Sequence, residues 1–252
     1  MRNTPAQARR EMSRLNVISL LAFGMMLVLP ATVRAEQSSQ IAESIAKTYG
    51  LDSFGQVEAI RYTWNVDSPM GKISRMWEWS PKTNTVSYDG KDKGGKPLKV
   101  TYQRSQVDSQ ADVVKKEVDP NFANDQYWLL LPFHIVWDGV SVTDDGVQKL
   151  PIGDGSADRV VVKYPSEGGY QPGDTWDLYV GKDKRIEEIV YHRGAPTPPP
   201  RLVMATYTDY KKAGPLLFAT DHHGTIDGKP FRLYFTDISV KMTGSDNWIN
   251  AQ

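Results

Sequence analysis

Apolar residues recur at every second position between residues 59 and 102. In the first such run, Ile60, Tyr62, Trp64 and Val66 alternate with polar or small neighbours. A period of two is typical of strands with one buried face, as in an antiparallel sheet covered on one side. Turns rich in Gly, Lys, Asp and Asn separate the runs, which favours a meander of four strands. The apolar positions of the other three strands are Ile73, Trp77 and Trp79; Val86 and Tyr88; and Leu98, Val100 and Tyr102.

The second half of the chain returns to this pattern. It predicts six further strands, at residues 159–164, 175–180, 185–192, 202–210, 216–222 and 231–242. Asp227-Gly228 is the strongest hairpin signal, because both residues tolerate the positive φ angles of a tight turn. The apolar positions of the last strand change from odd to even after Phe235, which predicts a β-bulge near Thr236 and Asp237.

Two segments depart from the period of two. Residues 39–49 carry apolar side chains four positions apart, which predicts a short amphipathic helix that ends at Gly50. Asp119-Pro120 has the residues of a helix N-cap and first turn. Residues 121–137 hold ten large apolar or aromatic residues without alternation, and Pro132 interrupts a helix there. We therefore predict a short helix followed by an irregular apolar stretch that plugs the concave face of the sheet.

These elements predict a mainly β (α+β) fold. We expect a strongly curved antiparallel sheet or unclosed β-barrel, with an N-terminal helix and a central helical plug. An all-β sandwich is the alternative, but it offers no obvious place for the long apolar segment between the fourth and fifth strands. The sequence shows no repeat and no break in composition, so residues 36–252 are expected to form one domain.

Residues 1–35 have the pattern of a cleavable signal peptide. Four arginines precede an apolar run at 15–29, and Ala31-Thr-Val-Arg-Ala35 follows, which predicts cleavage after Ala35. The run is shorter than the roughly 20 residues of a membrane-spanning helix. We expect export to the periplasm by the Sec route, while Arg9-Arg10 leaves the twin-arginine route open.

Composition narrows the classes of function. Thirty basic and thirty acidic residues balance, so the chain lacks the positive charge of a nucleic-acid-binding protein. The absence of cysteine excludes disulfides, thiol nucleophiles and cysteine-ligated metals.

The chain also lacks the common catalytic patterns. His222 and His223 are adjacent on a predicted strand and point to opposite faces, so they cannot readily share one metal ion. No Gly-x-Ser-x-Gly elbow or HExxH spacing occurs. We predict no catalytic residue, no metal site and no cofactor. Two alternatives stay open, an envelope hydrolase acting on a glycan or lipid, and a structural partner in an envelope assembly.

The order of these elements resembles the LolA/LolB-like superfamily. The local likeness is in Asp125-Gln-Tyr-Trp-Leu-Leu-Leu-Pro-Phe-His134, Val160-Val-Val-Lys-Tyr164 and Thr175-Trp-Asp-Leu-Tyr-Val180. That superfamily comprises periplasmic lipoprotein carriers and related lipid-binding proteins, built as an unclosed β-barrel with a helical lid. The resemblance implies the same half-barrel for residues 36–252 and a non-catalytic role in binding a lipid.

Aromatic side chains on the predicted concave face suggest where an apolar ligand binds. An acyl chain that leaves water there gains about 0.8 kcal/mol per methylene. The alternative is that the rings form only the core of the sheet. Arg75 shares the face of Trp77 and could anchor a headgroup or extend to the rim. The predicted ligand-binding residues are Tyr62, Trp64, Arg75, Trp77, Trp79, Tyr102, Trp128, Leu130 and Phe133. The expected partners are a lipid or other amphiphile, an envelope protein or lipoprotein, and the membrane surface.

Overall fold

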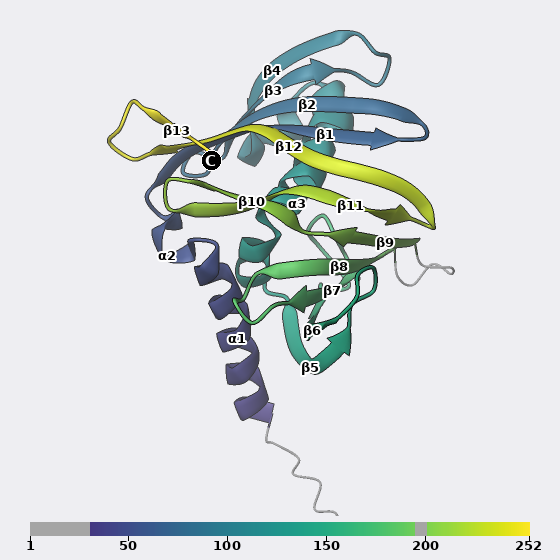
Figure 1. The fold of residues 1–252 in the computed structure, drawn as a ribbon. Coiled ribbons are helices and arrows are strands. Elements are labelled where there is room, and N and C mark those ends of the chain that lie inside the picture. Colours follow the sequence, from purple (N-terminus) through teal and green to yellow (C-terminus); the bar gives the residue numbers. More distant parts are fainter. Residues whose placement is uncertain (1–30, 195–200) are drawn as a thin grey trace, which may run out of the picture.

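The computed structural model describes residues 31–194 and 201–252 (Figure 1). Most of the predicted signal peptide, residues 1–30, lies outside the described residues. The helices are α1 (Ala31–Thr48), α2 (Leu51–Phe54), the 3₁₀-helix η1 (Arg104–Ser109), the π-helix η2 (Val114–Val118) and α3 (Asp119–Trp137). Among the described residues, no helix combines the length and the apolarity needed to cross a membrane.

One antiparallel sheet of thirteen strands makes up most of the described chain (Figure 1). Its order is β4-β3-β2-β1-β12-β11-β9-β8-β7-β6-β5, with β10 paired to β11 and β13 paired to β12. The sheet is not closed into a barrel, because β4 and β5 are its two outer strands. This confirms the predicted fold class. The strands are β1 (Val57–Ser68), β2 (Gly71–Ser80), β3 (Thr85–Lys91), β4 (Pro97–Gln103), β5 (Ser141–Lys149), β6 (Ser156–Lys163), β7 (Thr175–Val180), β8 (Ile186–Arg193), β9 (Arg201–Thr206), β10 (Thr208–Ala213), β11 (Leu216–Ile226), β12 (Lys229–Met242) and β13 (Trp248–Asn250).

The strand predictions are confirmed with three differences. The segment predicted as one strand at 202–210 forms two strands, β9 and β10, separated at Tyr207. Two strands, β5 and β13, were not predicted. In β5 only Val142 is buried, so its sequence carries no alternating apolar face. In β13 three residues are too few to show a period.

The hairpin and the bulge are confirmed. Asp227 and Gly228 have φ angles of 50° and 79°, as a tight turn between β11 and β12 requires. Arg61 of β1 pairs with Ser239, whereas Thr63 pairs with Thr236, so three steps along β12 face two along β1. The bulge re-aligns β12, and both its odd residues before Thr236 and its even residues after Asp237 stay buried.

Helix α3 corrects two of the sequence predictions. Asp119 has helical backbone angles and continues the helix from η2, so it is not the N-cap. The stretch predicted to be irregular is helical to Trp137, with one non-helical residue, Leu130, two positions before Pro132. Proline disrupts a helix by removing one backbone donor and by its ring's clash with the preceding turn. Here 14 of the 19 residues of α3 are buried, and the free energy gained by this packing offsets the cost of Pro132 inside the helix.

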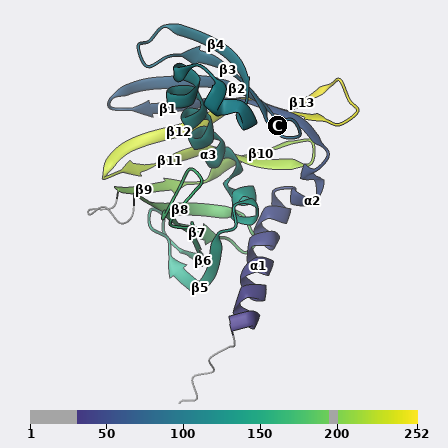
Figure 2. The ribbon, with the colours of Figure 1, turned by 180° about the vertical axis from the view of Figure 1, so that it is seen from behind.

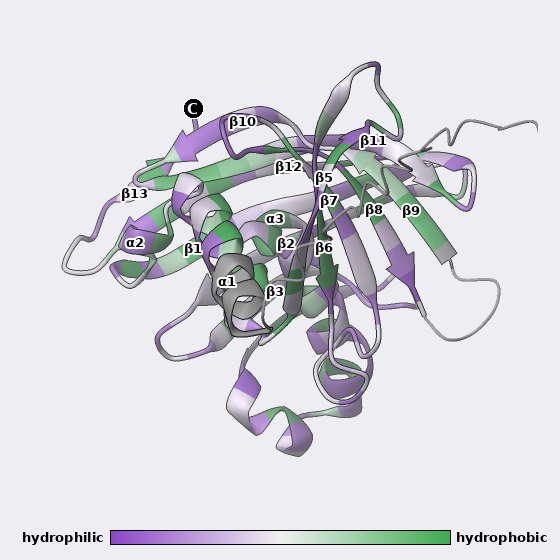
Figure 3. Ribbon diagram, turned by 90° about the horizontal axis from the view of Figure 1, so that it is seen from below, coloured by the Kyte–Doolittle hydropathy of each residue, from purple (hydrophilic) through white to green (hydrophobic). Residues whose placement is uncertain are grey.

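The sheet curves over α3, which crosses the strands on the concave side (Figures 2 and 3). Side chains from both form one continuous apolar core. The predicted N-terminal helix is confirmed as the end of α1, whose buried residues Ala42, Ile45 and Ala46 lie on one face. α1 packs against α3 and β5. The plug predicted from the sequence is therefore α3.

Candidate functional site

The predicted ligand-binding residues converge between the sheet and α3. We call the concave side of β1, β2, β4, β11 and β12 the trough. Eight of the nine predicted side chains are buried, and Arg75 is half-buried. Trp77 and Trp79 of β2 pack against Phe122 of α3, with ring centroids 5.4 and 6.2 Å apart. In this structure α3 occupies the trough, and the predicted residues pack against it or belong to it.

Arg75 and Asp125 join the sheet to α3. Two guanidinium nitrogens of Arg75, Nε and an Nη, donate to the carboxylate oxygens of Asp125 at 2.6 and 2.7 Å, and Trp77 Nε1 donates at 2.9 Å. The guanidinium lies 3.9 Å from the ring centroid of Trp64. Burial raises the pKa of Asp125 despite these donors. The Arg75 side chain is only 12% exposed, so it turns inward to α3 instead of extending to the rim.

Asp119 forms a second attachment at the start of α3. Its carboxylate accepts hydrogen bonds from Tyr102 Oη of β4 at 2.9 Å, from Arg104 Nε at 2.8 Å and from Tyr170 Oη. Partial burial raises the pKa of Asp119, but the hydrogen bonds outweigh it and the pKa lies below its ordinary value. The two attachments hold α3 against both β2 and the end of β4.

A third polar contact lies at the end of α3, between the buried His134 and the half-buried Asp138. Asp138 accepts a hydrogen bond from Tyr127 Oη, and its Oδ2 lies 3.0 Å from His134 Nδ1. The rings of Tyr127 and His134 are stacked at 3.8 Å. The sequence analysis missed all three aspartates as polar contacts of the plug. The available signal was that Asp125 and Asp138 lie within or beside an otherwise apolar segment.

Two hollows flank α3. The first, which we call the side hollow, has a volume of about 350 Å³. It is lined by the rings of Tyr127, Trp128, Trp176 and Tyr191 and by polar residues that include Asn124, Gln171, Asp174 and Arg193. The second, about 880 Å³, lies at the start of α3 and is lined by polar as well as apolar residues, among them Arg75, Ile73, Lys91 and Pro120. Of the predicted residues, Trp128 lines the side hollow and Arg75 the second.

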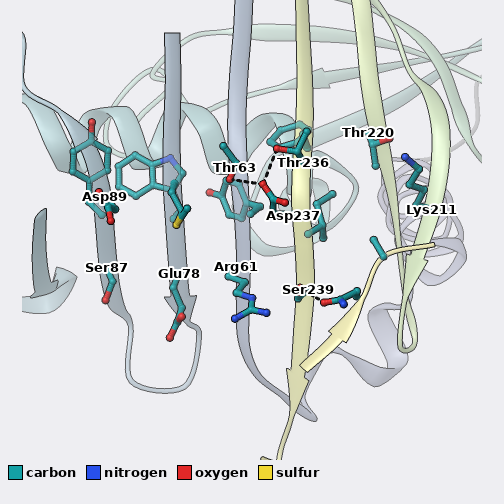
Figure 4. Close-up of a pocket in the computed structure, with 18 of the residues that line it drawn as sticks. Arg61, Thr63, Glu78, Ser87, Asp89, Lys211, Thr220, Thr236, Asp237 and Ser239 are labelled. Carbon is teal, nitrogen blue, oxygen red and sulfur yellow. Dashed lines mark hydrogen bonds between the residues drawn. The ribbon is translucent and has the colours of Figure 1, made fainter. Parts of the chain in front are cut away.

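A third hollow, of about 870 Å³, lies on the outer face of the sheet (Figure 4). Arg61 and Thr63, which alternate with the inward Tyr62 and Trp64, point into it. Asp237 at the bulge accepts hydrogen bonds from Thr63 Oγ1 and Thr236 Oγ1 at 3.1 and 3.0 Å. The predicted residues Tyr62 and Trp77 also line this hollow, together with polar side chains such as Glu78 and Lys211.

Histidines and carboxylates do not form a metal cluster in the part of the chain that the structure describes. His222 is fully buried, whereas His223 is exposed, so the two point to opposite faces as predicted. Glu188 accepts hydrogen bonds from the backbone nitrogens of Ile152 and Gly153, both at 2.7 Å, and so holds a loop.

Comparison with family models gives no match, and no curated protein is similar in sequence. Solved structures with a similar fold include a DUF1329 family protein from Desulfovibrio piger, with 8% identity and a TM-score of 0.46, covering 84% of this chain and 95% of that one. An outer membrane lipoprotein-sorting protein domain from Vibrio parahaemolyticus has 10% identity, a TM-score of 0.47 and the same coverage. The lipoprotein LppX of Mycobacterium tuberculosis has 9% identity and a TM-score of 0.29, covering 79% of this chain and 94% of that one. The likeness of these neighbours to this chain is confined to the course of the backbone, at 8–10% identity.

Proposed function

We propose that the protein is a non-catalytic periplasmic protein that binds the acyl chain of a lipid, a lipoprotein or another amphiphile between the curved sheet and α3. The observation that carries this proposal is the side hollow, where the rings of Tyr127, Trp128, Trp176 and Tyr191 meet between α3 and the sheet. The predicted signal peptide supports the location. A lipoprotein, an envelope protein or the membrane surface would supply or receive the ligand.

The rings of the side hollow offer contacts to an apolar chain, and polar residues such as Asp174 and Arg193 lie beside them. The hollow's volume of about 350 Å³ falls within the range of about 300–1,000 Å³ for small-molecule sites. Each methylene that leaves water for such a site contributes about 0.8 kcal/mol. A chain of about a dozen carbons therefore gains several kcal/mol after the cost of ordering it, which suits reversible uptake and release.

A longer chain requires α3 to move. The helix has two irregular points, the π-helix η2 before it and the non-helical Leu130 within it. π-helical turns and proline kinks are places where a helix bends. Since the sheet is unclosed, α3 can shift away from the trough without breaking a strand pairing.

Trp128→Ala tests this proposal. Trp128 lines the side hollow and packs on Trp176 and Phe231, each with ring centroids 6.1 Å apart. Loss of a central aromatic contact of this kind typically costs more than 1 kcal/mol, so we expect the dissociation constant of a fluorescent fatty acid to rise about tenfold.

Trp248→Ala is the matched control. Trp248 lies in β13 with its ring under Arg61, on the outer face. We expect unchanged uptake in this variant, with circular dichroism showing that both variants are folded. Equal uptake by folded Trp128→Ala and wild-type protein would exclude the side hollow as the binding site.

A further inference from the structure

Several buried polar side-chain atoms of the described residues have no hydrogen-bond partner in the structure, and two of them belong to neighbouring side chains. These two are Nε2 of His222 in β11 and the hydroxyl oxygen of Tyr207, between β9 and β10. Their rings are in contact, with centroids 4.2 Å apart. Buried polar groups are normally paired, so two orphans in adjoining side chains require an explanation.

The hydrogen bonding of His222 defines what its free nitrogen can do. Nδ1 lies 3.0 Å from the carbonyl oxygen of Thr206, which can only accept, so Nδ1 carries the proton. Nε2 of the neutral ring is then an acceptor. Burial lowers the pKa of His222 to about 4, so the ring stays neutral near pH 7. The Tyr207 hydroxyl can donate or accept.

Trp128 lies beside this pair and also lines the side hollow. Its ring centroid lies 5.6 Å from that of His222 and 6.4 Å from that of Tyr207. A ligand that enters the hollow and displaces the Trp128 ring would therefore reach His222 and Tyr207.

We propose that His222 and Tyr207 are the polar end of the ligand site and bind the hydroxyl group of an amphiphile. This inference rests on the proposed function and names the ligand class, a neutral chain with a hydroxyl group. A hydroxyl can donate to His222 Nε2 and accept from Tyr207. A phosphate or carboxylate would gain no cationic partner from either side chain, so this end of the site disfavours an anionic group.

The experiment compares two isomeric probes, dodecan-1-ol and 1-methoxyundecane, which have equal numbers of heavy atoms but differ in the hydroxyl donor. Each competes with a fluorescent fatty alcohol for the mature protein. We expect wild-type protein to prefer the alcohol by about fivefold, the ratio that one net hydrogen bond of about 1 kcal/mol gives. Tyr207→Phe, which deletes only the unpaired hydroxyl, and His222→Phe are each expected to remove most of this preference.

Tyr164→Phe is the matched control, because it removes a buried hydroxyl that faces Tyr127 and not His222. It should keep the wild-type preference. If folded Tyr207→Phe and His222→Phe bind both probes with the wild-type ratio, the inference is wrong while the proposed function stands. If wild-type protein binds neither the fluorescent fatty alcohol nor the probes, the proposed function fails and this inference with it.

Discussion

A few polar side chains fix the position of α3, the predicted plug, against the sheet. Asp125 receives three donors from Arg75 and Trp77 of β2, and Asp119 receives a donor from Tyr102 of β4. Arg75 and Asp125 lie 50 positions apart, so no local pattern could pair them. The sequence analysis placed Arg75 on the correct face of the sheet. Its partner became visible only when α3 was seen packed against that face.

The buried His222 predicts how the free energy of unfolding depends on pH. Its pKa is about 6.5 in an unfolded chain, and burial lowers it to about 4 in the folded protein. Between these values the unfolded state binds a proton that the folded state does not. The contribution of neutral His222 to the free energy of unfolding is therefore complete above about pH 6.5. As the pH falls towards 4, the free energy of unfolding decreases through this group by about 3 kcal/mol in total.

Urea denaturation of wild-type protein and His222→Phe at several pH values measures this effect. Both proteins have the same carboxylates, so the carboxylate contributions to the pH dependence cancel when one free energy of unfolding is subtracted from the other. We expect the difference in free energy of unfolding to change by about 3 kcal/mol between pH 7 and pH 4. A constant difference over that range would show that His222 is not buried in its neutral form.

At the scale of elements, local patterns predicted most strands and failed where tertiary packing decides. Strand β12 was predicted together with its bulge, because its apolar residues change from odd to even positions at the bulge. β5 was missed because eight of its nine residues are exposed. The sequence did not predict that α3 continues as a helix through Pro132. Burial against the sheet outweighs the free-energy cost of a proline inside a helix, and the local sequence of α3 does not show that the sheet packs there.

The pairing of β9 and β11 offers a sharp element-scale prediction. Gly224 of β11 approaches β9 so closely that a Cβ atom there would lie 1.8 Å from the carbonyl oxygen of Met204. Because the obstructing atom is backbone, Gly224→Ala must push the two strands apart. We expect a loss of about 3 kcal/mol in the free energy of unfolding, at the upper end for overpacking.

Gly55→Ala is the control, because its added Cβ meets nothing within 4 Å and its φ is −60°. Thermal and urea unfolding of both variants provide the measurement. If Gly224→Ala is as stable as Gly55→Ala, β9 and β11 do not pair at this distance.

At the scale of the whole molecule, the central pairing joins distant halves of the chain. β1 pairs with β12, so that Trp64 lies opposite Phe235. The sequence indicated two meanders and a plug, and hence an unclosed curved sheet. It could not give the strand order, because antiparallel strands with one apolar face are compatible with many neighbours. The predicted site residues do meet around one helix, and the rings that line the side hollow from β7 and β8, Trp176 and Tyr191, were not among them.

We expect the ligand and α3 to compete for the trough, and cross-linking α3 to the sheet tests this. The natural chain has no cysteine, so Arg75→Cys/Asp125→Cys introduces a unique pair of thiols where the two side chains now meet. A short bis-maleimide with a linker that reduction cleaves would join β2 to α3 covalently. Reduction would then separate α3 from β2 again. The single variant Arg75→Cys, treated with the same reagent, controls for the modification.

The decisive measurement is the dissociation constant of a fluorescent long-chain fatty acid for the double variant before cross-linking, after it and after reduction. We predict near wild-type affinity before cross-linking, a loss of at least about tenfold when α3 is held to β2, and recovery on reduction. Undiminished binding by the fully cross-linked protein would contradict the account, because the ligand would then bind without any movement of α3.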